Sequence, residues 1–75
     1  MTRRGRFLDW EELGEALYMH ILYDDADARS RELVDPTFQN SPDQGPPPLT
    51  RGMAVDVTVA AQLLGHSVVV AIALA

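Results

Sequence analysis

The spacing of hydrophobic residues changes along this chain of 75 residues, and the change divides the chain into segments. In the segment 9–35, apolar side chains recur every three or four positions, at Trp10, Leu13, Leu17 and Ile21. This spacing places them on one side of an α-helix. Asp9, followed three residues later by Glu12, is typical of the first turn of a helix. The pattern therefore predicts an acidic amphipathic helix in this segment.

The C-terminal segment, residues 53–75, has a different period. From Met53 to Ala60, β-branched and apolar residues alternate with smaller or polar ones, as in a half-buried β-strand. A second run, from Ser67 to Ala75, is almost continuously apolar and is typical of a strand buried on both faces. The two runs are expected to pair as an antiparallel hairpin.

The remaining residues are predicted to form the linker between the two segments and the N-terminal end of the chain. Residues 36–52 contain all five prolines and predict an extended linker, while residues 1–8 carry three arginines and are interpreted as a basic, frayed end. The predicted fold is one small α+β domain over residues 1–75, in which the helix packs on a small antiparallel sheet. A chain this short buries only roughly 60% of its unfolded surface, so we expect a homo-oligomer or an obligate complex.

Composition excludes several classes of function. The net charge is −5, and nine of the eleven acidic residues lie between Asp9 and Asp35, which argues against direct binding to nucleic acid. There is no cysteine, and the chain has only two histidines as good nitrogen ligands. Because no glycine-rich phosphate loop or nucleophile paired with a base is recognisable, we expect no enzymatic activity, catalytic residue, cofactor or metal.

A partner-binding surface is predicted on the acidic segment. In a helix, Met19 and Leu22 would lie opposite the apolar stripe, surrounded by carboxylates. The predicted contact residues are therefore Glu11, Glu15, Met19, Leu22, Asp24, Asp25 and Asp27. The alternative is that the two apolar residues are ordinary exposed side chains and that the aspartates form a charged turn.

These features indicate a small acidic protein-binding module, for example a phage-type inhibitor that occupies a basic nucleic-acid-binding surface of its partner. One alternative is a structural subunit of a virion or multiprotein complex, whose C-terminal strand completes a neighbour's sheet. Another is a tail-anchored membrane protein, since residues 57–75 are long enough to cross a bilayer, although Gln62 and His66 would lie within the span. We expect a cytoplasmic or virion-associated location.

Overall fold

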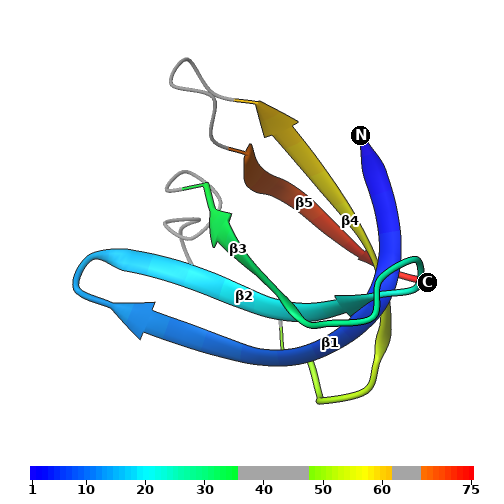
Figure 1. Ribbon diagram of the computed structural model, residues 1–75. Coiled ribbons are helices and arrows are strands. Elements are labelled where there is room, and N and C mark those ends of the chain that lie inside the picture. The colour runs from blue at the N-terminus through cyan, green and yellow to red at the C-terminus, as the bar shows by residue number, and fades with distance from the viewer. Residues whose placement is uncertain (36–47, 62–66) are drawn as a thin grey trace.

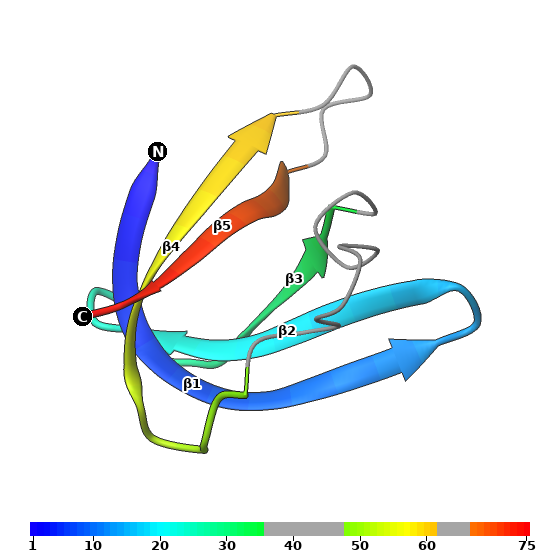
Figure 2. The same ribbon diagram turned by 180° about the vertical axis from the view of Figure 1, so that it is seen from behind.

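The described part of the molecule, residues 1–35, 48–61 and 67–75 of a computed structural model, is built from β-strands and contains no helix. The strands are β1 (Thr2–Leu13), β2 (Ala16–Tyr23), β3 (Ser30–Val34), β4 (Ala54–Ala61) and β5 (Ser67–Leu74). They close into a barrel in the order β1-β2-β3-β5-β4 (Figures 1 and 2). The prediction of an α+β fold with an N-terminal helix on a hairpin was therefore wrong.

The segment that we predicted to be helical forms a β-hairpin instead. Leu13 and Ala16 are partners in the register of β1 and β2, so the two strands are joined by a two-residue loop. Gly14 occupies the first position of this loop with φ of 61°, a conformation that glycine adopts without steric cost. In β2, every second residue is buried, from Leu17 to Tyr23. This alternation of period two competes with the helical spacing and matches the observed strand.

The N-terminal residues are part of the barrel and are not a frayed end. Thr2 to Arg6 pair with β4, while Gly5 to Leu13 pair with β2, so β1 belongs to both halves of the sheet. The strand bends where its register with β2 shifts, between Phe7 and Asp9. Such an irregularity increases the local twist and curvature that closure of a barrel requires.

The two predicted C-terminal strands are confirmed by β4 and β5, which pair antiparallel. Burial of the second strand differs from the prediction, because Val68 and Val69 are buried whereas most residues from Val70 to Leu74 are exposed. β5 also pairs in parallel with β3, through Leu33 and Val34 only. The barrel is thus closed by a short contact at the beginning of β5.

The core fills the interior of this barrel. Its buried residues come from all five strands: Phe7, Leu17, Met19, Ile21, Tyr23, Val34, Val55, Val57 and Val69. Most of the predicted linker, residues 36–47, lies outside the described residues; the described part, 48–52, ends in a turn held against β1. There the Gly52 N–H donates to the Phe7 carbonyl at 2.7 Å.

β1 to β4 form a Greek key, since β4 lies beside β1 while β1, β2 and β3 follow one another in the sheet. Five-stranded Greek-key barrels, the OB-fold among them, occur in proteins of unrelated functions. The architecture alone therefore does not indicate what this protein does.

Candidate functional site

The seven predicted contact residues do not share a face. Glu11 lies on β1, Glu15 follows Gly14 in the β1–β2 loop, and Met19 and Leu22 lie on β2. The three aspartates, Asp24, Asp25 and Asp27, belong to the β2–β3 connection. Because the eight residues of β2 span roughly 26 Å, the acidic residues before and after this strand are far apart. The described residues therefore form no continuous acidic face of the predicted kind.

Met19 and Leu22 have opposite environments. Met19 is fully buried in the core, where it pairs with Trp10 of β1 and Glu32 of β3, and it cannot contact a partner. Leu22 is 37% exposed on the outer surface and lies opposite Arg6. The prediction failed for Met19 because side chains alternate between the two faces in a strand, whereas the helical spacing placed both residues on one side.

Glu11 joins a polar cluster that sequence reasoning missed. Its Oε1 lies 2.8 Å from His20 Nε2 and 2.8 Å from Arg31 Nε, and the Arg31 guanidinium stacks 3.7 Å above the centre of the Tyr18 ring. The hydrogen bonds from His20 and then Arg31 lower the pKa of Glu11. Because an ionised carboxylate only accepts hydrogen bonds, Nε2 of His20 carries the proton.

This cluster stabilises the contact among three strands. The register of the sheet places Glu11 beside Tyr18, and His20 beside Arg31, so residues far apart in the sequence meet on the outer face of β1, β2 and β3. His20 Nε2 and Arg31 Nε both hydrogen-bond to the same carboxylate, that of Glu11. Among the described residues, no group of three acidic, histidine or cysteine side chains is arranged to hold a metal ion. We interpret the cluster as a set of interactions that stabilises the pairing of these strands.

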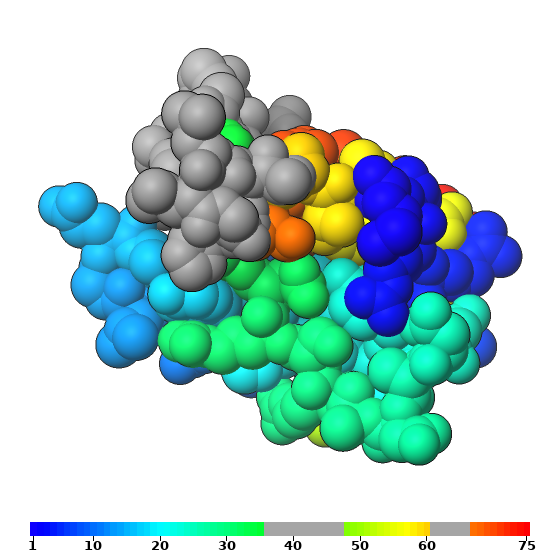
Figure 3. Space-filling model, turned by 45° about the horizontal axis from the view of Figure 1, so that its top comes forward, coloured from blue at the N-terminus to red at the C-terminus, as the bar shows by residue number. Residues whose placement is uncertain are grey.

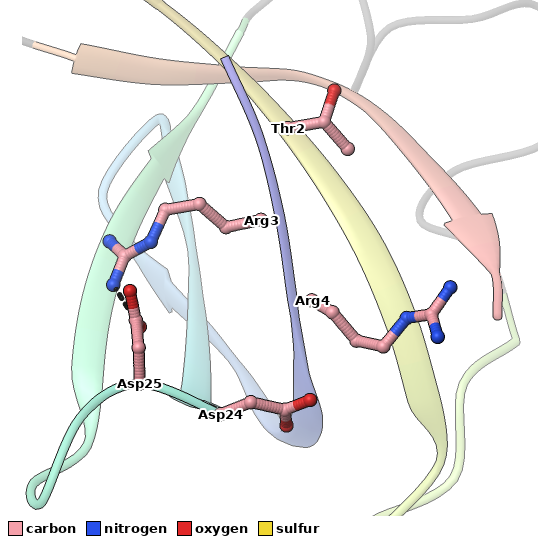
Figure 4. A pocket seen from close by; sticks show the side chains of 5 residues that line it. All are labelled: Thr2, Arg3, Arg4, Asp24 and Asp25. Atoms are coloured by element: carbon pink, nitrogen blue, oxygen red, sulfur yellow. Dashed lines mark hydrogen bonds and ion pairs between the residues drawn. The ribbon is translucent and has the colours of Figure 1, made fainter.

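A charged groove lies between the N-terminus and the β2–β3 connection. It has a volume of about 290 Å³ and is lined by Thr2, Arg3, Arg4, Asp24 and Asp25 (Figure 4). On the surface, the N-terminal residues lie beside β4 and near the β2–β3 connection (Figure 3). The two arginines and two aspartates of the lining cancel in formal charge.

The ion pairs in and beside this groove involve one residue of the predicted acidic surface, Asp25. Arg3 Nη2 lies 2.7 Å from Asp25 Oδ1, and Arg4 donates from Nε and Nη2 to the two carboxylate oxygens of Asp56, at 2.9 and 3.2 Å. These arginines lower the pKa of Asp25 and of Asp56. The Arg3 guanidinium also stacks 3.7 Å from the centre of the Tyr23 ring. Asp25 is thus engaged within the molecule.

The second half of β5 is an exposed, apolar part of the described structure. Val70 and Leu74 are exposed, Leu74 by 66%, and the half-buried Ile72 packs at the margin of the core. No residue of β5 is ionisable. In Figures 1 and 2, this half of β5 runs beside β4 toward the C-terminus.

The hydrogen bonds of β4 show which groups of β5 face away from it. Ala75 N–H donates to the Ala54 carbonyl at 3.1 Å, which makes these two residues a hydrogen-bonded pair of the antiparallel ladder. Since hydrogen-bonded and non-hydrogen-bonded pairs alternate, Ala73 and Ala71 bond to β4, whereas Ile72 and Leu74 do not. The N–H and C=O groups of Ile72 and Leu74 therefore point to the other edge of β5.

No strand of the described structure occupies that edge. The contact of β3 with β5 ends with Val34 opposite Val69, followed by a hydrogen bond from Asp35 N–H to the Val69 carbonyl at 2.9 Å. Beyond this point, among residues 1–35, 48–61 and 67–75, Ile72 and Leu74 have no neighbouring strand except β4. Exposed apolar side chains and unpaired backbone groups thus coincide on one edge.

Comparisons with known proteins identify no relative of this chain: no family model, curated protein or solved structure matches it. Nor does any helix in the described parts of the chain have the length and apolar character needed to cross a membrane. In the segment that suggested a tail anchor, residues 57–61 and 67–74 belong to β4 and β5.

Proposed function

We propose that this protein is a non-enzymatic protein-binding module that acts as a subunit of a complex by accepting an extended, uncharged strand along the open edge of β5. The observation that carries the proposal is the orientation of the Ile72 and Leu74 backbone groups toward an edge that no described strand fills. An added strand would pair with these groups, as in recognition by β-augmentation. As its setting we propose the cytoplasm or a virion, from the sequence considerations alone.

The chemistry of this edge favours an apolar partner strand. A charged side chain placed beside Leu74 would lose hydration without gaining an opposite charge, because β5 has no ionisable residue. An apolar strand instead removes the exposed Leu74 and the half-buried Ile72 from water. Exposed edges of this kind are usually protected by charge, proline or a covering element, since an open apolar edge pairs readily with another chain.

The acidic surface supports a second candidate function. Asp24 lies in the wall of the charged groove and Asp27 follows in the same connection, and neither forms an ion pair with a described residue. These two carboxylates could contact a basic protein surface, as the inhibitor hypothesis requires. The dependence of binding affinity on salt distinguishes the two candidate functions. The affinity of a charge-driven contact falls steeply as ionic strength rises, whereas the affinity of strand addition changes little.

The experiment is amide hydrogen exchange in the presence of an eight-residue peptide of alternating threonine and valine, a strand former without charge. At low micromolar protein concentration, bound peptide should slow exchange of the Ile72 and Leu74 amides by about tenfold or more, because both N–H groups gain an acceptor. Ala71 and Ala73, which already bond to β4, serve as internal controls and should change less.

The same peptide with an N-methyl group on every residue has no backbone N–H to donate to β5 along either edge and should lose this protection. High salt should leave the effect of the unmodified peptide unchanged. If no amide of β5 is protected by the peptide at saturating concentration, strand addition at this edge is wrong. A basic peptide that instead shifts the resonances of Asp24 and Asp27, and does so only at low salt, would favour the inhibitor function.

A further inference from the structure

The open edge of β5 is complementary to itself, and we infer that the strand it accepts is β5 of a second copy of this chain, related by a two-fold axis at Ala73. This inference rests on the proposed function, since it names the partner of the same edge. Residues 71–75 have the sequence Ala-Ile-Ala-Leu-Ala. Read in either direction, small and large side chains alternate in the same order. An antiparallel copy therefore places small opposite small and large opposite large.

The backbone independently selects the same centre. Ile72 and Leu74 are the residues whose N–H and C=O groups face the open edge. When Ala73 lies on the axis, Ile72 of each copy is opposite Leu74 of the other, and each of these residues can donate one hydrogen bond and accept one. A two-fold axis at Ile72 would instead place Leu74 opposite Val70 of the other copy. The N–H and C=O groups of Leu74 that face the open edge would then be less well paired.

Val70 is unsuited to that alternative because it interrupts the ladder with β4. Thr58 is the partner of Ala71 and Val59 is the partner of Val69, so Val70 has no partner in the register. A residue in such a bulge does not follow the alternation of its neighbours. The regular part of the edge therefore begins at Ala71, and an axis at Ala73 pairs Ile72 with Leu74 within it.

Side chains at the centre fit the spacing of the two strands. With Ala73 on the axis, its copies form a non-hydrogen-bonded pair, in which the Cα atoms approach to about 4.5 Å and small side chains pack best. Ile72 and Leu74 lie on the face that carries their β4 partners, the buried Val57 and Val55. Pairing of two copies would thus join their apolar residues into one row and would cover Leu74.

Charge distinguishes β5 from β1, β3 and β4 as a site of self-association. β2 also lacks acidic residues, lysine and arginine, but it already pairs with β1 on one side and with β3 on the other. β1, β3 and β4 each contain acidic or basic side chains, which oppose pairing when like charges face each other across a two-fold axis. β5 contains none. The edge can therefore approach its own copy without electrostatic repulsion, even though the whole chain carries a net charge of −5.

A charge exchange at Ala73 tests the inference. Because Ala73 is exposed and its backbone groups bond to β4, Ala73→Lys and Ala73→Glu should each preserve the barrel. Each variant places like charges against each other at the axis, so its dimer dissociation constant should rise on the order of tenfold or more. An equimolar mixture of the two variants should regain a dimer of twice 8.3 kDa, since lysine then faces glutamate.

Ala60→Lys is the matched control, because Ala60 is an exposed alanine of β4 that pairs near the beginning of β5, away from the open edge. Masses are measured by sedimentation equilibrium over a range of concentrations, with circular dichroism to verify folding. The inference requires that the wild type and Ala60→Lys dimerise alike, that each single Ala73 variant dimerises more weakly by on the order of tenfold or more, and that the mixture of the two Ala73 variants dimerises more strongly than either alone.

A wild-type chain that stays monomeric at millimolar concentration overturns the inference. If the threonine–valine peptide still protects Ile72 and Leu74 in that monomer, strand addition stands and only the identity of the partner is wrong. If the peptide gives no protection either, both proposals fail. A dimer that persists in Ala73→Lys and in Ala73→Glu to the same extent as in Ala60→Lys would place the interface elsewhere.

Discussion

At the scale of single residues, alternation along β2 determines which side chains stabilise the fold and which are available at the surface. Met19 and Tyr23 point into the core, whereas Leu22, between them, is partly exposed. Met19 and Leu22 are both apolar and lie close in sequence, yet the first stabilises the core and the second lies at the surface. The difference follows from the period of two that a strand imposes on its side chains.

Replacing Met19 by alanine should lower the free energy of unfolding by about 2–5 kcal/mol, because it removes buried contacts and leaves a cavity. Leu22→Ala, the control three residues away, should lower it by less than about 1 kcal/mol. Urea unfolding followed by circular dichroism measures both. Equal effects of the two changes would contradict the assignment of Met19 to the core.

Tyr23 should make stability depend on alkaline pH. Its side chain is 1% exposed, and burial raises its pKa to about 12, from 10.0. Because the unfolded chain then loses this proton first, the stability associated with the neutral phenol is complete below about pH 10 and is lost as pH rises through the folded-state value. Tyr23→Phe should remove this loss when urea unfolding is compared at about pH 9 and about pH 11.

The same substitution should raise stability at neutral pH by about 1 kcal/mol, since the Tyr23 hydroxyl is buried without a hydrogen-bond partner among the described residues. Tyr18→Phe, which leaves Tyr23 in place, is the control and should retain the alkaline loss. A Tyr23→Phe variant that weakens as strongly as the wild type between the two pH values would show that another group is responsible.

At the scale of elements, β1 determines the shape of the barrel, because it pairs with β4 through its first residues and with β2 through the rest. The strand passes close to β2 at Gly5. A Cβ atom there would lie 2.7 Å from the Leu22 carbonyl oxygen and 2.9 Å from the Tyr23 Cα. These are backbone atoms and cannot move aside as the end of a flexible side chain would.

Gly5→Ala should therefore destabilise the protein by about 1–3 kcal/mol, as overpacking does. Gly14→Asn provides the comparison. A Cβ at Gly14 meets nothing within 4 Å, and asparagine tolerates the positive φ of this loop better than most residues. Thermal unfolding should show a large decrease for the first variant and a small one for the second; the reverse order would contradict the close approach of β1 and β2.

At the scale of the whole molecule, closure of the barrel depends on β5. This strand contributes Val69 to the core and is the only link between β3 and β4 among the described strands. Truncation after Ser67 should therefore leave a chain that is unfolded or insoluble. Amide resonances dispersed as in a folded protein, in a soluble fragment 1–67, would show that the remaining strands form a stable sheet without β5.

Local pattern by itself determined the C-terminal half. The alternation from Met53 to Ala60 and the apolar run after Ser67 favoured two strands over a membrane-spanning segment, and β4 and β5 confirm both strands and their antiparallel pairing. The turn at Gly14 was also recognisable in principle, since glycine favours the positive φ that a two-residue hairpin loop requires.

The N-terminal half was decided by tertiary structure. Leu17 and Ile21 belong both to a helical stripe with Trp10 and Leu13 and to an alternating set with Met19 and Tyr23, so local spacing permits either element. The strands form in place of the helix because β1 can then pair with β4, and β2 with β3, which closes the barrel around one core. The same register brings Glu11 to His20 and Arg31, and it leaves the edge of β5 open, because both features depend on which strands become neighbours and by how many residues they are offset.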